Sequence, residues 1–235
     1  MGNRIAGLDL NTDVLVIGGG MAGAWAALAA ARDGARVVLV DKGYCGTSGV
    51  TATAGPGHWW VPLQRRDEVV AQRMHAGQGV GDAAWMHRVL ELTWQHLPTI
   101  APHYRFATDA SGVTHYRAMR GPEYMRALRA LVDEAGVQVL DHHPALELLR
   151  HADGSVAGAA GVQLLPPRQR WQVRAGAVVL ASGGCAFRAK LLGADNNTGD
   201  GALMAAELGA ELSGMEFTNA YNVAPVYSSM TRGMS

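Results

Sequence analysis

Residues 13–41 have the sequence DVLVIGGGMAGAWAALAAARDGARVVLVD, in which two apolar runs enclose a cluster of glycines and an alanine-rich segment. The run that ends at Ile17 predicts a strand, and the segment from Met21 to Arg32 predicts a helix that packs closely on a sheet. The second run, residues 36–40, is of the continuous apolar kind that is typical of buried parallel strands. Together these segments predict one βαβ unit over residues 13–41.

A glycine motif connects the first strand of this unit to its helix. Gly18-Gly19-Gly20-Met21-Ala22-Gly23 has the pattern G-x-G-x-x-G. The first glycine allows a tight turn, the second lets a pyrophosphate approach, and the third lets the helix lie against the strand. Asp41 ends the second strand, where its carboxylate can accept hydrogen bonds from both hydroxyls of a ribose and disfavours a 2′-phosphate. The motif predicts a dinucleotide site, and a glycine-rich turn beside a solvated aspartate is the structural alternative.

The composition excludes several classes of protein. The 235 residues include 20 basic and 20 acidic side chains, with no basic block that would bind nucleic acid or an anionic membrane. Residues 21–31 form the longest uncharged apolar stretch, which is far shorter than the roughly 20 residues that span a bilayer. Cys45 and Cys185 lie far apart and outside any C-x-x-C pattern, so we expect neither a disulfide nor a metal site. We therefore expect a cytoplasmic protein with no nucleic-acid partner and no membrane span.

The next segments predict a binding loop and a group of helices. Residues 43–57 are rich in Gly, Ser, Thr and Ala, a composition that lets a backbone approach a ligand closely. Residues 67–78 and 82–97 predict helices, each opened by an aspartate that can cap it. Both helices belong to a helical excursion from the sheet over residues 58–120.

The second part of the chain, residues 121–235, returns to alternating helix and strand. Residues 121–135 predict a helix and residues 137–140 a strand. Three short strand candidates between residues 145 and 173 indicate an antiparallel meander, and residues 177–180 predict a further buried strand. A plain NAD domain would continue with βαβ units instead. The whole chain is therefore predicted to be one α/β, Rossmann-like FAD-binding domain with a parallel sheet, a three-stranded β-meander and a helical excursion.

Four motifs, in the same order along the chain, resemble a known family of flavoproteins. They are Gly18 to Gly23, the loop Ser48-Gly49-Val50-Thr51-Ala52-Thr53-Ala54-Gly55, the turn Ala181-Ser182-Gly183-Gly184, and Asn197-Thr198-Gly199-Asp200-Gly201. The family comprises the flavoproteins of succinate dehydrogenase, fumarate reductase and L-aspartate oxidase, with the related adenylylsulfate reductase flavoprotein subunit. The resemblance implies an oxidoreductase that transfers a hydride between FAD and a small acid substrate.

The resemblance also implies which residues bind the cofactor. Asp41 and Lys42 would border the adenosine, residues 48–55 would wrap the flavin, Ala145 would supply a backbone contact to the adenine, and Asp200 would lie at a helix N-terminus near the cofactor. The complete set of candidate cofactor-binding residues is Gly18, Gly20, Met21, Ala22, Gly23, Asp41, Lys42, Thr47, Ser48, Gly49, Thr51, Ala54, Gly55, Ala145, Ser182, Gly183 and Asp200.

The chain departs from the family pattern at positions that bear on cofactor and substrate. Gly49 stands where the respiratory enzymes of the family carry a histidine that bonds covalently to FAD, so we expect FAD to be bound non-covalently. The family's substrate-binding His-Pro-Thr falls at residues 221–223, which are Tyr-Asn-Val and argue against succinate or fumarate as substrate. Residues 215–219, Met-Glu-Phe-Thr-Asn, are closer to the adenylylsulfate reductase branch.

No catalytic residue can be assigned from the resemblance. The family continues past the position of Ser235 into a capping domain that carries an arginine proton donor, and we expect this chain to lack that domain. Three alternatives stay open: an FAD-dependent oxidoreductase of the fumarate reductase or succinate dehydrogenase type, a cofactor-binding module or fragment that is inactive without a capping domain or partner chain, and an adenylylsulfate-reductase-like flavoprotein. An electron-transfer or capping partner is implied by analogy with the family.

Several other residues are expected to be structural. We expect solvated surface positions for His115, Arg120, His142 and His143. We expect packed positions for Cys45, Cys185, Trp59 and Trp60.

Overall fold

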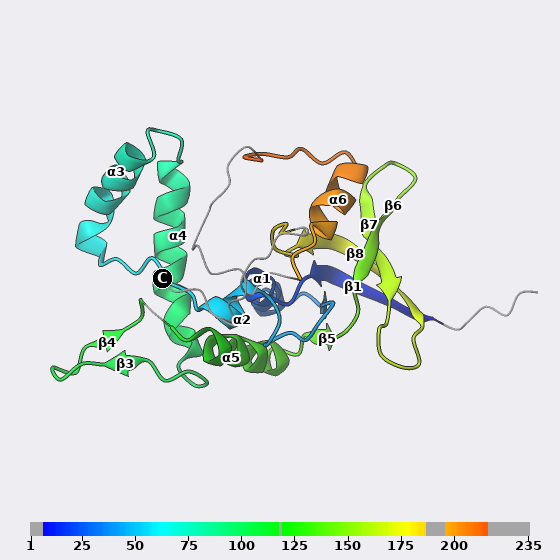
Figure 1. Ribbon diagram of the computed structural model, residues 1–235, viewed down its shortest axis with the longest axis horizontal. Coiled ribbons are helices and arrows are strands. Elements are labelled where there is room, and N and C mark those ends of the chain that lie inside the picture. The colour runs from blue at the N-terminus through cyan, green and yellow to red at the C-terminus, as the bar shows by residue number, and fades with distance from the viewer. Residues whose placement is uncertain (1–6, 118, 187–195, 216–235) are drawn as a thin grey trace, which may run out of the picture.

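A six-stranded β-sheet organises the part of the chain that the computed structural model describes, residues 7–117, 119–186 and 196–215 (Figure 1). The strand order in this sheet is β5-β2-β1-β8-β7-β6. The strands are β1 (Leu8–Ile17), β2 (Val37–Val40), β5 (Gln138–Leu140), β6 (Ala145–Arg150), β7 (Val156–Val162) and β8 (Arg170–Leu180). A separate small hairpin pairs β3 (Ala107–Thr108) with β4 (Thr114–His115).

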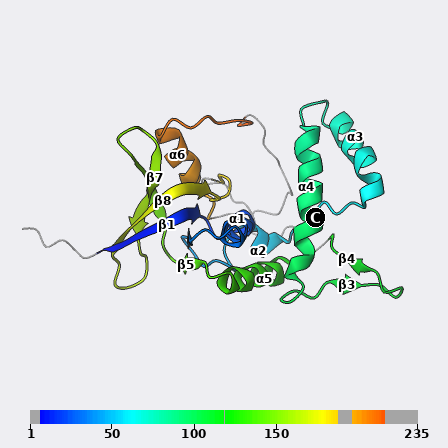
Figure 2. The ribbon, with the colours of Figure 1, turned by 180° about the vertical axis from the view of Figure 1, so that it is seen from behind.

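The helices lie on both sides of the sheet and beyond its end. They are α1 (Met21–Arg32), α2 (Val50–Ala54), α3 (Arg66–Ala76), α4 (Ala83–His96), α5 (Gly121–Glu134) and α6 (Asp200–Glu207), with short 3-10 turns at Leu63–Arg65 and Leu97–Ile100. Figures 1 and 2 show α1, α2 and α5 together on one side, α6 beside the meander, and the α3–α4 pair standing apart from the sheet. Among the described residues, no helix is both long and apolar enough to span a bilayer.

The parallel half of the sheet confirms the predicted α/β fold. β5, β2, β1 and β8 run parallel, and Val14 of β1 lies between Val37 of β2 and Ala177 of β8. The sequence predicted a first strand that begins at Asp13. The strand begins at Leu8 instead, because β8 extends the ladder down to the Leu8–Trp171 pair.

The meander is part of the same sheet, which corrects one prediction. β6, β7 and β8 are antiparallel neighbours as predicted, but the third meander strand and the strand predicted at residues 177–180 are one continuous strand, β8. Gly176 does not interrupt this strand, because its two neighbours along the chain, Ala175 and Ala177, both pair with residues of β1. The end of β8 is also less buried than predicted, with Leu180 37% exposed.

Side-chain alternation along β1 fills two cores. Val16 points to the side of α1 and α5, where it packs with Leu28 and Leu128. Leu15 points to the opposite side, where it packs with Trp171. Each of these side chains is at most 2% exposed, and full burial of such a side chain stabilises the fold by about 1.5–3 kcal/mol. The two cores therefore fix β1, and with it the glycine turn that follows Ile17.

The segment predicted as a loop over residues 43–57 contains a helix. Val50–Ala54 forms α2, flanked by Gly49 with φ +85° and Gly55 with φ +96°. These conformations suit glycine, and the run between them holds neither glycine nor proline. A short helix therefore forms between two glycine hinges and packs against α5.

The α3–α4 pair is held by its own small core. Asp82 caps α4 as predicted, because its carboxylate accepts a hydrogen bond from the Trp85 backbone N–H at 3.0 Å. Asp67 lies inside the first turn of α3 instead of capping it. Trp60 stacks on Trp94 with ring centroids 4.2 Å apart, and Trp59 packs against the core of this pair, so the predicted packing role of both tryptophans is confirmed.

Candidate cofactor-binding site

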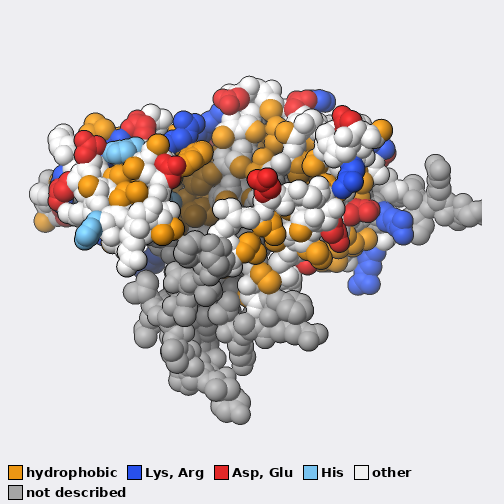
Figure 3. Space-filling view, turned by 90° about the horizontal axis from the view of Figure 1, so that it is seen from above, with side chains coloured by type: hydrophobic (Ala, Val, Ile, Leu, Met, Phe, Trp, Pro, Cys, Tyr) orange, Lys and Arg blue, Asp and Glu red, His pale blue; other side chains and the backbone are white. Residues whose placement is uncertain are grey.

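A cavity of about 550 Å³ opens where three parallel strands end. Ile17, Val40 and Leu180, the last residues of β1, β2 and β8, all line it. Ligands of open α/β sheets bind at the carboxyl ends of the strands, and small-molecule sites have volumes of about 300–1,000 Å³. Seen from above, this face of the molecule carries a hollow lined by hydrophobic side chains (Figure 3). The position and the volume of this cavity suit an extended small ligand.

Most of the predicted cofactor-binding residues line this cavity. They are Gly18, Gly20, Met21, Ala22, Asp41, Lys42, Ser48, Gly49, Thr51, Ala145, Ser182, Gly183 and Asp200. The cavity lining does not include Gly23, Thr47, Ala54 or Gly55. The two glycines among these four residues have packing roles. A Cβ on Gly23 would lie 1.7 Å from the Gly18 carbonyl oxygen, and one on Gly55 would lie 2.9 Å from the Met119 carbonyl oxygen. The predicted motif at residues 221–223 and most of residues 215–219 lie outside the described residues.

The N-terminus of α1 faces the cavity with free backbone donors. Gly20 is the N-cap residue, and no side chain caps the first turn of α1. Met21 and Ala22, the first helical residues, line the cavity. The first N–H groups of a helix have no partner within the helix, and the helix dipole favours an anion near them by about 0.3–1 kcal/mol. A Cβ on Gly20 would meet no atom within 4 Å, so the space in front of this turn is open.

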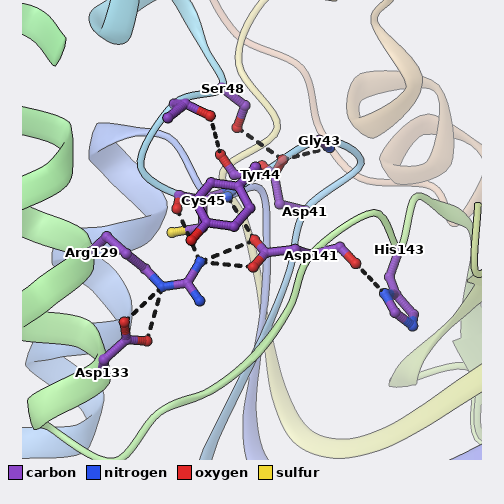
Figure 4. Close-up of polar contacts among 11 residues, drawn as sticks. Asp41, Gly43, Tyr44, Cys45, Ser48, Arg129, Asp133, Asp141 and His143 are labelled. Carbon is purple, nitrogen blue, oxygen red and sulfur yellow. Dashed lines mark hydrogen bonds and ion pairs between the residues drawn. The ribbon is translucent and has the colours of Figure 1, made fainter. Parts of the chain in front are cut away.

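Asp41 is buried and is the centre of a hydrogen-bond network (Figure 4). Its carboxylate accepts hydrogen bonds from the Gly19 N–H at 2.6 Å, the Gly43 N–H at 2.7 Å and the Ser48 hydroxyl at 2.9 Å. The residue is 7% exposed, which rules out the alternative of a solvated aspartate. A carboxylate can accept about four hydrogen bonds, so Asp41 keeps the capacity to bind one further donor on its cavity side.

Lys42 and Asp200 meet across the rim of the cavity. Lys42 Nζ donates to the Thr198 hydroxyl at 2.8 Å and lies 3.6 Å from Asp200 Oδ2, while the Thr198 hydroxyl also hydrogen-bonds to the Asp200 carboxylate. Gly199, the N-cap residue of α6, has φ +82°. An exposed ion pair of this kind contributes at most about 1 kcal/mol. Its effect is to join the end of β2 to the start of α6.

His143 is a cavity residue that the sequence did not reveal. It was predicted to be solvated, but it is 8% exposed and lines the cavity. Its Nδ1 donates to the Asp141 carbonyl oxygen at 2.6 Å, because a carbonyl oxygen can only accept. Its backbone N–H donates to the Asp41 carbonyl oxygen at 2.7 Å. The sequence feature that could have revealed this residue is its position just after a parallel strand, at the same sheet edge as Asp41.

The remaining candidates lie away from the cavity or are packed. His115 and Arg120 are exposed as predicted, and His115 pairs with Asp109 at 3.1 Å. Within the described ranges, no group of three His, Cys, Asp or Glu side chains could hold a metal ion. Cys45 is buried as predicted, whereas Cys185 is exposed, because it follows the open turn at Gly183 and Gly184.

The two cysteines are expected to differ in reactivity. Burial raises the pKa of the Cys45 thiol to about 12, so it stays protonated and shielded at neutral pH. We expect a thiol reagent to label one of the two cysteines in the native protein, Cys185, and to label Cys45 only after denaturation. Titration of the wild type and of Cys185→Ser with Ellman's reagent measures this. Native labelling of Cys185→Ser would contradict the burial of Cys45.

These features together define a dinucleotide-binding domain of a flavoprotein: a βαβ unit with a glycine turn, a buried acid after its second strand and an attached meander. The chain belongs to the FAD dependent oxidoreductase family, whose model matches residues 13–216. Its cofactor is accordingly FAD.

Individual relatives agree with this assignment. The chain is 26% identical to "Probable fumarate reductase Ifc3" of Shewanella frigidimarina, over 92% of this chain and 42% of that protein. It is 30% identical to "L-aspartate oxidase" of Streptomyces coelicolor, over 90% of this chain and 40% of that protein. The fold matches E. coli quinol fumarate reductase with a TM-score of 0.72 and 22% identity, over 85% of this chain and 37% of that one. The chain thus spans less than half the length of these relatives.

The residues around the cavity fit the cofactor of the family. The uncapped first turn of α1 and the open space before Gly20 fit a pyrophosphate. Asp41 fits a ribose, because it lines the cavity and its carboxylate can accept a further hydrogen bond. The first of these features lies in the turn between β1 and α1, and Asp41 lies at the adjoining end of β2.

Proposed function

We propose that this protein is an oxidoreductase that transfers a hydride between non-covalently bound FAD and a small carboxylic acid. The observation that carries the proposal is the cavity at the strand ends, which combines the free N-terminus of α1 with the buried carboxylate of Asp41. Fumarate and aspartate, which are named for the relatives above, are both small carboxylic acids. This supports the same class of substrate here.

The proposal assigns parts to the following residues of the cavity. The Met21 and Ala22 amides would hold the pyrophosphate, and Asp41 would accept hydrogen bonds from the ribose. Ala145 and His143 would border the adenine, while Ser48, Gly49, Thr51, Ser182 and Gly183 would flank the ring system of the flavin. When bound, FAD supplies the group that accepts or donates a hydride, and the protein supplies orientation and electrostatics.

Non-covalent binding is supported by the backbone at Gly49. This residue has φ +85° and ψ 163°, a conformation that essentially only glycine adopts without strain. A histidine that bonds to FAD would be strained at this position. Purified protein should therefore be yellow and should release its flavin into the supernatant on acid precipitation. Flavin that stays in the acid pellet would contradict non-covalent binding, and a colourless protein that cannot be reconstituted with FAD would contradict the proposed cofactor site.

A cofactor-binding module is the second candidate, and one observation favours it. Lys42 is the single Lys or Arg among the described residues that line the cavity, and Asp200 already pairs with it. A carboxylate substrate needs a cationic partner, so further residues, from elsewhere in the chain or from a partner chain, would have to supply it. Reduction of an artificial electron acceptor by the FAD-loaded protein, across a panel of mono- and dicarboxylic acids, separates the candidates. Turnover supports the enzyme, and flavin binding without any turnover supports the module.

Location and partners belong to the same proposal. We propose a cytoplasmic protein, which is supported by the two free cysteines, because unpaired thiols are typical of a reducing compartment. We also propose an electron-transfer or capping partner. Cell fractionation and size-exclusion chromatography of the native protein test these two points.

A further inference from the structure

Arg129 of α5 lies at the centre of an ion-pair network beside the cavity (Figure 4). Its Nε donates to both carboxylate oxygens of Asp133, at 2.9 and 3.0 Å. Its Nη1 donates to both carboxylate oxygens of Asp141, at 2.8 and 3.1 Å. The Arg129 and Asp141 side chains are 19% and 17% exposed, so this pair is much less solvated than an ordinary surface pair.

The same guanidinium holds the beginning of the loop that follows β2. Arg129 Nη1 donates to the Cys45 carbonyl oxygen at 3.0 Å, and the Cys45 N–H donates to Asp141 Oδ1 at 2.7 Å. The guanidinium carbon also lies 4.9 Å from the centre of the Tyr44 ring, within the range of a cation–π contact. Both peptide groups of Cys45 are therefore fixed by the Arg129–Asp141 pair.

The segment that Arg129 fixes continues to the cavity. The Tyr44 carbonyl oxygen accepts hydrogen bonds from the Thr47 N–H at 3.0 Å and the Ser48 N–H at 2.9 Å. This turn places the Ser48 hydroxyl on the Asp41 carboxylate and brings Gly49 to the cavity. Arg129 itself is absent from the described residues that line the cavity, so it can act on a ligand there only through this loop.

Arg129 also balances the negative charges of two acids, Asp133 and Asp141, which both pair with its guanidinium. Burial lowers the pKa of the Arg129 guanidinium, but the hydrogen bonds to Asp141 and Asp133 outweigh this effect and raise the pKa above its ordinary value. The guanidinium therefore stays charged at neutral pH. Without it, the Asp141 carboxylate would keep one strong donor, the Cys45 N–H, and would lose its counter-charge.

We propose that Arg129 is a positioning residue for the cofactor: through Tyr44 and Cys45 it holds the loop from Asp41 to Gly49 in the conformation that binds FAD. The proposal rests on FAD being the ligand of this cavity. A preformed loop binds more tightly than one that must be ordered on binding, because its conformational entropy is lost when the protein folds and not when the ligand binds. Loss of Arg129 should therefore weaken FAD binding without removing any direct contact to FAD.

The test compares three variants of the full chain with the wild type. Arg129→Gln removes the charge and the fork of donors, Arg129→Lys keeps the charge, and Arg36→Gln is the matched control. Arg36 forms a comparable two-point pair with Asp13, but this pair is exposed and lies away from the loop. Apoprotein is titrated with FAD at a temperature at which circular dichroism shows each variant to be folded, and the dissociation constant is obtained from the quenching of flavin fluorescence.

The expected order of FAD affinity is wild type and Arg36→Gln together, then Arg129→Lys, then Arg129→Gln, with a loss of about tenfold or more for the last. Arg129→Lys should recover part of the affinity that Arg129→Gln loses, because lysine keeps the positive charge beside Asp141. A loss of packing alone would not depend on this charge. Should Arg129→Gln fail to fold, the Arg129→Lys variant carries the test, with an expected loss of at least about threefold.

Two outcomes would overturn the positioning role. One is an unchanged FAD affinity in Arg129→Lys and Arg129→Gln, and the other is an equal loss in Arg36→Gln. These outcomes differ from a failure of the proposed function, because in that case the wild-type protein itself would not bind FAD.

Discussion

Replacement of Gly23 by alanine is expected to destabilise the apoprotein by about 3 kcal/mol or more, a large part of the stability of an ordinary domain. A Cβ at this position would lie 1.7 Å from the Gly18 carbonyl oxygen and 3.0 Å from its carbon. Both of these atoms belong to the backbone of the turn, which is fixed by β1 on one side and by α1 on the other. Relief would require α1 to move off the sheet, where Leu28 fills the core. Urea unfolding followed by circular dichroism measures the loss.

The variant Gly20→Ala is the matched control, because it adds the same methyl group to the same turn. Its Cβ would meet no atom within 4 Å, and the backbone there has φ −74°, which alanine adopts freely. We expect the stability of the apoprotein to change by less than about 1 kcal/mol. The FAD affinity should nevertheless fall by about tenfold, because the methyl group enters the space expected for the pyrophosphate. A stable Gly23→Ala would refute the close helix–strand packing, and a Gly20→Ala that binds FAD normally would place the pyrophosphate elsewhere.

The contrast between these two glycines shows how far the motif could be interpreted from sequence. The spacing of glycines and apolar runs predicted the strand, the turn and the helix, because each is decided by residues close in the chain. It also predicted the close packing at Gly23. It did not separate packing glycines from glycines that line the cavity, because that distinction depends on what lies opposite each one. Gly55 illustrates this, since its neighbour is the Met119 carbonyl oxygen from a distant segment.

The errors in the predicted fold have the same origin. The sequence places a break before residue 177, yet β8 continues through Gly176, because β1 supplies partners for its whole length. The burial of His143 and the network of Arg129 were also not predicted. Arg129 contacts Cys45 across 84 residues of sequence, and no local pattern records such a contact.

Replacement of Asp41 by asparagine is expected to lower FAD affinity by about 100-fold and to destabilise the apoprotein as well. In the folded protein three donors point at the carboxylate: the Gly19 N–H, the Gly43 N–H and the Ser48 hydroxyl. An asparagine amide has a single acceptor oxygen, so in either orientation its NH₂ group faces a backbone N–H. A buried donor without an acceptor costs about 1–3 kcal/mol, and the loss of a hydrogen bond to a charged group costs about 1.5–3 kcal/mol. Because the single amide oxygen would have to serve these three donors and the ribose, FAD affinity and the stability of the apoprotein should both fall.

The matched control for this variant is Asp13→Asn. Asp13 is also an aspartate of the βαβ unit, but its side chain is 47% exposed, pairs with Arg36 in the middle of β1 and does not line the cavity. We expect Asp13→Asn to bind FAD with unchanged affinity, as measured by the same fluorescence titration. If Asp41→Asn lost stability but kept its FAD affinity, Asp41 would serve only to hold Gly19 and Ser48 in place. If both variants lost affinity equally, the effect would come from the net charge of the domain. The expected difference between them ties the affinity to Asp41, which is buried and lines the cavity.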